Sequence, residues 1–143
     1  MAQACQHVVI SDATRLAMPE AAIGLFPDAG ASLFFGRCPR SIALYLGLAG
    51  PFLSAADCLL LGLAEAMVPA ERMAALETAL SGCETEQIDS VIERFRGDPG
   101  AAQLPQIRSV LDHVFTGSDL AAMQQRANDL AQIKENKLAA DIA

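Results

Sequence analysis

The chain has 143 residues, of which 52% are hydrophobic, with a mean hydropathy of +0.31 and a formal net charge of −7. This length forms one domain or a piece of one. The acidic balance argues against binding to nucleic acid or to anionic membranes, because contact with phosphates requires a basic face. The excess of apolar residues predicts either an oligomer or a fragment whose apolar surface would be buried by the missing part of a longer protein.

Cysteine and histidine are too few and too scattered for a zinc site. The four cysteines contain no C-x-x-C pair, and His7 and His113 are the two histidines. The sequence therefore predicts no metal centre. Scattered cysteines, together with a start that lacks a signal-like apolar core, favour a reducing cytoplasm. The uncharged stretch 41–56 is shorter than the ~20 residues of a membrane span, so buried soluble helices are expected instead.

Short strands and turns are expected first along the chain. His7–Ile10 (HVVI) is rich in β-branched residues and predicts a strand, and Arg15–Met18 predicts a second strand that Pro19 stops. Residues 19–31 are rich in turn formers. Ala31–Gly36 predicts a short helix.

Two further helices and a strand are expected next. Pro39 suits the first turn of a helix, flanked by Arg37 and Arg40, which are read as solvent-facing charges or, less readily, as contacts to a phosphate. The apolar residues of this helix are expected to be buried: Ile42, Tyr45, Leu46 and Leu48. Ser54 is expected to cap another helix that ends near Gly62, before a strand at 66–68.

After Pro69 the apolar residues recur at helical spacing. The stripes predict four helices, with these apolar positions: Met73, Leu76 and Leu80; Ile88, Val91, Ile92 and Phe95; Leu104, Ile107, Val110, Leu111, Val114 and Phe115; Leu120, Met123, Ala127 and Leu130. The segment 97–100 ends the second helix, and Ser118 is expected to cap the fourth. These stripes are read as core-facing in preference to partner-binding. The expected fold is predominantly helical, with few short strands at the N-terminal side followed by a helical array.

The stretch LAMPEAAIGLFPDAG at residues 16–30 sets two carboxylates, Glu20 and Asp28, beside prolines in an apolar segment. Carboxylates held in this way can act as base, nucleophile or acid. They can equally be structural, with Glu20 capping a helix and Asp28 in a turn. Spacing alone favours the structural interpretation. Elsewhere there is no phosphate-binding glycine loop, Ser32 lacks a nucleophile-elbow context, and both histidines lie in apolar-periodic segments.

Two stretches favour the catalytic interpretation of Glu20 and Asp28 over the structural one, because together they resemble a known family. SDATRLAMPEAAIGLFPDAG, followed by LYLGLAGPFLSAADCLLLGLAEAMVP, resembles the crotonase (enoyl-CoA hydratase/isomerase) superfamily. The pattern MPE-x-x-IG-x-FPD-x-G, and the helical tail from AERMAALETAL to VFTGSDL, are similar to its 3-hydroxyisobutyryl-CoA hydrolase-like branch. The resemblance covers most of residues 5–130.

The resemblance implies an α/β crotonase-like fragment, with residues 1–69 as the latter part of the core and 70–143 as an incomplete helical segment. It implies a CoA thioester hydrolase of valine breakdown that acts on an acyl-CoA substrate and needs no cofactor beyond the coenzyme A of that substrate. Strands such as His7–Ile10 would lose neighbours in such a fragment, and the exposed edges and apolar surface predict a homo-oligomer. Glu20 and Asp28 fall on the positions of the catalytic carboxylates. The residues around them are expected in the substrate pocket: Ile23, Gly24, Phe26 and Gly30.

The segments that supply the family's oxyanion-stabilising N–H groups would precede residue 1, so little or no turnover is expected from this polypeptide alone. Two alternatives stay open. The first is an enoyl-CoA hydratase/isomerase, which would not need Asp28. The second is a non-catalytic helical oligomerisation module, which would self-associate without binding coenzyme A.

Overall fold

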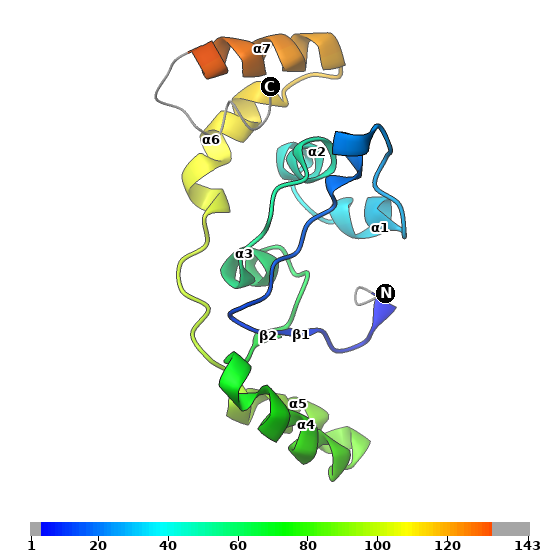
Figure 1. Cartoon of the computed structure of the whole chain (residues 1–143), viewed down its shortest axis with the longest axis vertical. Helices are drawn as coiled ribbons and strands as arrows, with labels where there is room; N and C mark the ends of the chain where they lie inside the picture. The colour runs from blue at the N-terminus through cyan, green and yellow to red at the C-terminus, as the bar shows by residue number, and fades with distance from the viewer. Residues whose placement is uncertain (1–3, 133–143) are drawn as a thin grey trace. The chain divides into compact units, whose positions relative to one another are not determined.

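Helices dominate the computed structural model of the chain, which describes residues 4–132 (Figure 1). The chain folds into two units. One comprises Met1–Leu16 and Leu53–Gln103, and the other comprises Ala17–Phe52 and Leu104–Ala143. The units interleave along the sequence, unlike the expected division at residues 69 and 70. That division concerns the organisation of the family and stays a prediction.

The strands of the first unit form a two-stranded parallel pair. Strand β1 (Val9–Ile10) lies beside β2 (Ala66–Met67), and Val68 N–H donates to the Ile10 carbonyl at 2.9 Å. The strands predicted at His7–Ile10 and at 66–68 are present, but each is shorter than expected. The strand expected at Arg15–Met18 is wrong: Leu16 makes only an isolated antiparallel bridge with Leu53. A single bridge of this kind does not make a strand.

Helix α3 (Ala55–Leu60) begins where the sequence predicts it. The Ser54 hydroxyl accepts from Asp57 N–H at 3.1 Å and donates to the Asp57 carboxylate at 2.6 Å. The other carboxylate oxygen of Asp57 accepts from Gln103 N–H at 2.8 Å, which explains how this carboxylate can be buried. After the helix, Gly62 adopts the left-handed conformation at φ +67°.

The helix pair α4 (Met73–Ser81) and α5 (Ile88–Phe95) builds the core of the first unit. A short 3-10 turn precedes each helix, η3 (Ala70–Arg72) and η4 (Thr85–Gln87), and the second turn carries a reciprocal capping box. The buried residues of α4 and α5 form one cluster with residues in and just after β2: Ala66, Val68, Leu76, Val91 and Ile92. The predicted stripe therefore faces the core.

The second unit begins with a 3-10 turn, η2 (Pro19–Ile23), followed by α1 (Ala31–Phe35) and α2 (Arg40–Ala49). Helix α2 packs against η2 and α6. Three of its four predicted core residues are buried, but Leu48 is half-exposed. The reason is that α2 is covered on part of its circumference, not all round.

Helices α6 (Leu104–Val114) and α7 (Leu120–Gln132) complete this unit. Four successive carbonyls, from the last residue of α6 at 114 to residue 117, accept hydrogen bonds from the guanidinium groups of Arg40 and Arg126. Cations there compensate the unpaired carbonyls and the negative end of the helix. Arg40 thus serves the fold. Asp119, not Ser118, caps α7: its carboxylate accepts from Ala121 N–H at 2.9 Å.

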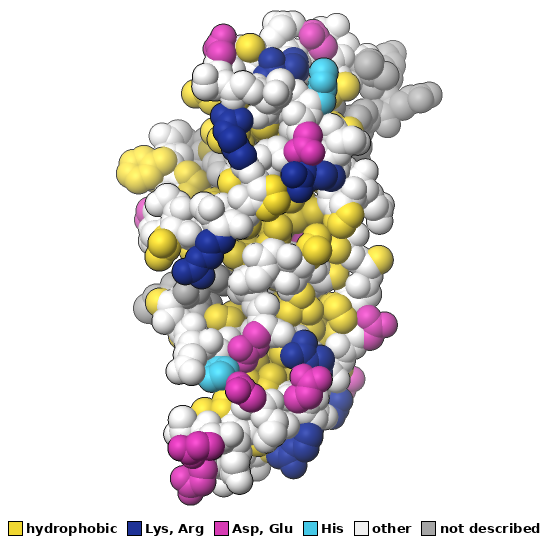
Figure 2. All heavy atoms as spheres, turned by 180° about the vertical axis from the view of Figure 1, so that it is seen from behind, with side chains coloured by type: hydrophobic (Ala, Val, Ile, Leu, Met, Phe, Trp, Pro, Cys, Tyr) yellow, Lys and Arg dark blue, Asp and Glu magenta, His cyan; other side chains and the backbone are white. Residues whose placement is uncertain are grey.

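Large hydrophobic side chains also reach the surface, as the yellow atoms in Figure 2 show. Those exposed by about half or more are Ile23, Leu25, Phe26, Leu33, Leu48, Phe52, Leu60 and Leu120. Within residues 4–132, no helix is long and apolar enough to cross a membrane.

Candidate functional site

The Glu20 segment is a tight turn whose shape follows from its sequence. Pro19 stands at the start of η2, where its fixed φ suits a helical turn and its missing N–H costs nothing. Gly24 closes the turn in the left-handed conformation at φ +77°. Gly24 N–H donates to the Ala21 carbonyl at 3.1 Å, and Leu25 N–H donates to the Glu20 carbonyl at 3.0 Å. The backbone of Glu20 is therefore held within a closed turn.

The side chain of Glu20 points one oxygen into the protein. Its Oε2 atom is buried and has no hydrogen-bond partner among the described residues. Buried polar atoms are nearly always paired, and an exception calls for a reason such as a catalytic role or a ligand that completes the site. The structural interpretation expected Glu20 to cap a helix, but η2 has no side-chain cap hydrogen bond and Oε2 of Glu20 is unpartnered among the described residues.

Asp28 lies at the start of the next turn and is exposed. Its carbonyl accepts from Ala31 N–H at 2.8 Å, and the two residues between them both have positive φ, 49° at Ala29 and 79° at Gly30. A non-glycine residue in this region costs on the order of 1–2 kcal/mol. Strained backbone of this kind gathers at functional sites. The turn leaves the Asp28 carboxylate at the surface.

The expected pocket residues lie on the same exposed segment. Ile23 is 74% exposed and Phe26 is 80% exposed, while Gly24 and Gly30 serve as left-handed turn residues. The structure thus gathers the six predicted residues on one segment of one unit, between residues 19 and 31. Their contact with a substrate stays a prediction. An apolar segment left open to solvent in this way fits a surface that receives a ligand or another piece of protein.

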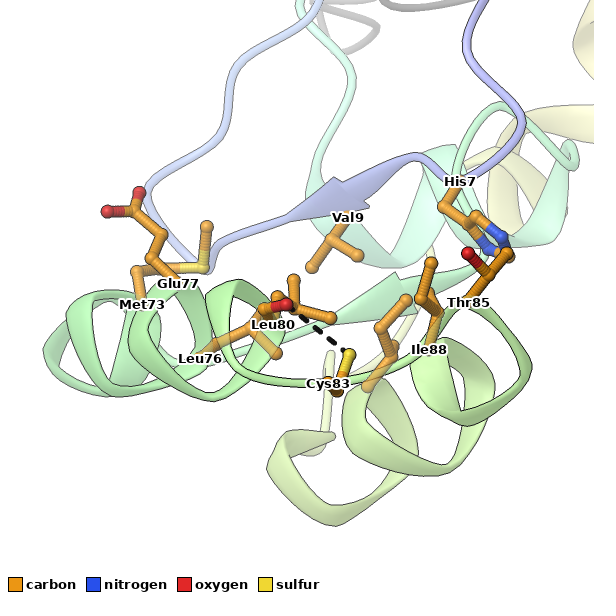
Figure 3. Close-up of a pocket in the computed structure, with 10 residues that line it drawn as sticks. His7, Val9, Met73, Leu76, Glu77, Leu80, Cys83, Thr85 and Ile88 are labelled. Carbon is orange, nitrogen blue, oxygen red and sulfur yellow. Dashed lines mark hydrogen bonds between the residues drawn. The ribbon is translucent and has the colours of Figure 1, made fainter.

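Sequence reasoning missed a separate cavity in the first unit. It has a volume of about 410 Å³ and lies between β1 and the pair α4–α5 (Figure 3). The lining is mainly apolar: Val9, Met73, Leu76, Leu80, Cys83, Ile88 and Ile92, with His7, Glu77 and Thr85. The apolar spacing in 73–95 predicts the helices α4 and α5. It does not predict that these helices leave a cavity between themselves and β1.

His7 lies at one end of this cavity beside Thr85 (Figure 3). Its Nδ1 is 3.0 Å from the Glu65 carboxylate and 3.5 Å from the Asp89 carboxylate. A protonated Nδ1 donates to Glu65, which orients the imidazole, as expected of a structural histidine. Among the described residues, no three His, Cys, Asp or Glu side chains gather in a way that could hold a metal ion.

Three groups outside the Glu20 segment have shifted pKa values. Burial raises the pKa of the Cys38 thiol. Burial, and then the charge of Asp57, raise the pKa of Cys58 to about 11. Hydrogen bonds from Ser41 and then from Arg108 lower the pKa of Asp112. Burial disfavours the thiolate form at both cysteines, so neither is the preferred candidate for a nucleophile.

Glu20 has a carboxylate oxygen that is buried without a hydrogen-bond partner among the described residues, and it stands on a closed turn in a segment with exposed apolar side chains. These features define a candidate acid–base site. Comparison with known proteins identifies the class. A family model described as "Enoyl-CoA hydratase/isomerase" matches residues 1–143. The chain belongs to this family, the crotonase superfamily that its motifs predicted.

Several curated relatives are named as 3-hydroxyisobutyryl-CoA hydrolases, and one, from Schizosaccharomyces pombe, is named "Small ribosomal subunit protein mS47". An Arabidopsis thaliana protein named "Probable 3-hydroxyisobutyryl-CoA hydrolase 3" is 47% identical over 113 residues, which cover 76% of this chain and 30% of that protein. A Xenopus tropicalis protein named "3-hydroxyisobutyryl-CoA hydrolase, mitochondrial" is 33% identical over 123 residues, which cover 80% of this chain and 32% of that protein. The chain thus spans about a third of the length of these relatives.

A solved structure confirms the fold. The carnitinyl-CoA dehydratase of Mycobacterium thermoresistibile matches 99% of this chain and 39% of its own, with a TM-score of 0.83 and 26% identity. The predicted crotonase-like fold, with short strands followed by helices, is confirmed.

The expected cytoplasmic location is wrong. The Xenopus tropicalis relative is named as mitochondrial, as are relatives from Xenopus laevis and Homo sapiens. Free cysteines indicate only a reducing environment and do not distinguish one such compartment from another. The first residues of a stretch that spans a third of its relatives also say nothing about a leader sequence.

Proposed function

We propose that this chain supplies the catalytic segment of an acyl-CoA thioester hydrolase related to 3-hydroxyisobutyryl-CoA hydrolase, an enzyme of valine degradation. The observation that carries the proposal is the buried Oε2 of Glu20, which has no hydrogen-bond partner in the described part of the chain. A substrate or an attacking water would complete its hydrogen bonding. The names of the curated relatives support this substrate class.

The two carboxylates take different roles in the proposal. Water adds to the thioester carbon, its proton passes to Glu20, and the C–S bond breaks so that the coenzyme A thiolate leaves and takes up a proton. Asp28, on the neighbouring exposed turn, accepts a hydrogen bond from the 3-hydroxyl group of the acyl chain. Coenzyme A enters as part of the substrate, and the reaction needs no separate cofactor. We further infer a homo-oligomer, since exposed apolar side chains need cover.

A graft tests the proposal without depending on where this chain begins or ends. The 113 aligned residues of the Arabidopsis relative would be replaced by those of this chain, and thiol release from 3-hydroxyisobutyryl-CoA would be followed. We expect activity in the graft and a loss of roughly 10²-fold or more in Glu20→Gln, because general-base catalysis contributes about 10²–10⁴-fold. Asp28→Asn is expected to lose activity mainly toward substrates with the 3-hydroxyl group. A folded graft that retains full activity after Glu20→Gln would refute the proposal.

The hydratase alternative is favoured by one observation, the fold match to a carnitinyl-CoA dehydratase. The same graft distinguishes it. Hydration of crotonyl-CoA that depends on Glu20 and survives Asp28→Asn would favour a hydratase over a hydrolase. A chain that self-associates but does not bind coenzyme A would instead support the assembly module.

A further inference from the structure

We infer that Gly50 is a positioning residue for Glu20, because the C-terminal end of α2 holds the backbone of the Glu20 turn at a distance that only glycine permits. The inference rests on the proposed role of Glu20. It concerns a residue outside the 19–31 segment, thirty positions further along the chain.

Gly50 meets the Glu20 turn at its first residue. A Cβ atom at Gly50 would lie 2.8 Å from Pro19 Cα and 2.9 Å from the Met18 carbonyl oxygen. Both are backbone atoms, so no side chain could rotate away to make room. Any larger residue at position 50 therefore pushes the start of η2 away from α2.

The turn is also constrained at its other end. Its far end is fixed by the left-handed Gly24 and by the hydrogen bond from Leu25 N–H to the Glu20 carbonyl. Glu20 is directly bonded to Pro19, so a displacement at Pro19 also shifts the backbone from which the Glu20 carboxylate extends. A misplacement of about 1 Å at a reacting group can cost on the order of 10²-fold in rate.

The chain offers a matched control for the conformational cost of substitution. Gly50 and Gly62 both follow helices in the left-handed conformation, at φ +58° and +67°. A Cβ at Gly62 would meet no atom within 4 Å. Gly50→Ala and Gly62→Ala therefore share the penalty for positive φ, but Gly50→Ala alone adds the backbone contact.

A second variant separates the contact from the conformational cost at position 50 itself. Asparagine tolerates the left-handed conformation better than alanine does, yet it has the same Cβ atom. Gly50→Asn is thus expected to fold more readily than Gly50→Ala while still displacing the turn. If left-handed φ alone mattered, Gly50→Asn would restore the wild-type site.

The primary readout needs no catalysis. The side-chain carboxyl carbon of Glu20 and the amide of Leu25 would be assigned by NMR in the chain and in the three variants. We expect both signals to shift in Gly50→Ala and Gly50→Asn and to stay in place in Gly62→Ala. Unchanged signals in both Gly50 variants, or equal shifts in Gly62→Ala, would overturn the inference.

The second readout uses the graft with 3-hydroxyisobutyryl-CoA. The Gly50 variants are expected to lower kcat about ten- to a hundred-fold with little change in KM, since the displaced group acts on the reacting atoms. Gly62→Ala is expected to keep both values. A rise in KM at constant kcat would contradict positioning of Glu20. An inactive graft would count against the proposed function, while the NMR readout would still test Gly50.

Discussion

The segment 19–33 and the helix pair α4–α5 place polar and apolar side chains in opposite ways. In the helix pair, Leu76, Val91 and Ile92 are buried, and charged side chains face solvent. In the segment 19–33, Ile23, Phe26 and other large apolar side chains face solvent while a carboxylate oxygen of Glu20 is buried. The side chains of the helix pair stabilise the folded chain. The exposed apolar side chains of the segment 19–33 are instead available for contact with a ligand or another protein surface.

This difference separates stability from function in the chain. A buried apolar cluster contributes to folding through the removal of its surface from water. An unpaired buried carboxylate opposes folding, because its lost hydration is not replaced. Natural proteins accept such costs mainly where a site needs them. The contrast makes predictions that can be tested with the same chemical change in both regions.

The largest effect is expected from removing a core leucine. Leu76→Ala should lower the free energy of unfolding by about 2–5 kcal/mol, because Leu76 is 2% exposed in the core cluster and its loss leaves a cavity. The matched change Leu33→Ala, at a leucine that is 70% exposed, should cost no more than about 0.5 kcal/mol. Urea unfolding followed by circular dichroism measures both. Similar losses for the two variants would refute the proposed contrast between the regions.

A smaller effect is expected at the start of α3. Ser54→Ala should cost about 1–2 kcal/mol, since it removes the helix cap and a hydrogen-bond donor to the buried Asp57 carboxylate. Ser90→Ala is the control, because the Ser90 hydroxyl is exposed and donates only to the Gln87 carbonyl. The control should stay within about 0.5 kcal/mol in the same urea experiment. An equally small loss for Ser54→Ala would mean that the Ser54 hydroxyl is not needed to keep the Asp57 carboxylate buried.

The sequence predicts the regions dominated by local patterns. Helices α4 and α5 follow from apolar spacing, and the start of α3 from the Ser54 cap, because both depend on residues a few positions apart. Features that join distant residues could not be predicted. Arg40 bonds to carbonyls more than seventy residues away, and the orienting contact between His7 and Glu65 joins residues 58 apart.

The candidate site shows the same limit. Residue types and prolines drew attention to Glu20 and Asp28, and the family resemblance supplied their roles. Nothing local indicated that one carboxylate would be buried and the other exposed. That outcome depends on how α2 packs against η2, and on the Gly50 contact that allows it.

The contact between α2 and α6 makes the stability of the second unit depend on pH. The pKa of Asp112 lies below its ordinary value of 3.8 because the Ser41 hydroxyl and then Arg108 donate to its carboxylate. The ionised form therefore stabilises the folded state. This contribution is present above pH 3.8 and is lost as pH falls through the lower folded value.

Ser41→Ala tests this dependence. Removing the largest cause should bring the pKa of Asp112 back toward its ordinary value and make the loss of stability in acid smaller. Urea midpoints measured from about pH 6 down to about pH 2 would show this as a flatter profile. Asp112→Asn, which cannot ionise, should flatten it at least as much. A profile unchanged in both variants would exclude Asp112 as the source.

The smallest effect on stability is expected at Phe26, which is 80% exposed. Phe26→Ser should change the free energy of unfolding by no more than about 0.5 kcal/mol, because the ring contributes little buried surface. If the exposed apolar side chains of segment 19–33 mediate association, the same variant should lower the mass seen by sedimentation at high concentration. Leu120→Ser, at another exposed apolar residue on α7, is the control. An equal drop in mass for both variants would indicate non-specific hydrophobic association. A drop in mass for Phe26→Ser alone would mean that the segment 19–33, which carries Glu20, is also the surface through which the chain associates. No drop in either variant would contradict the inferred oligomer at this surface.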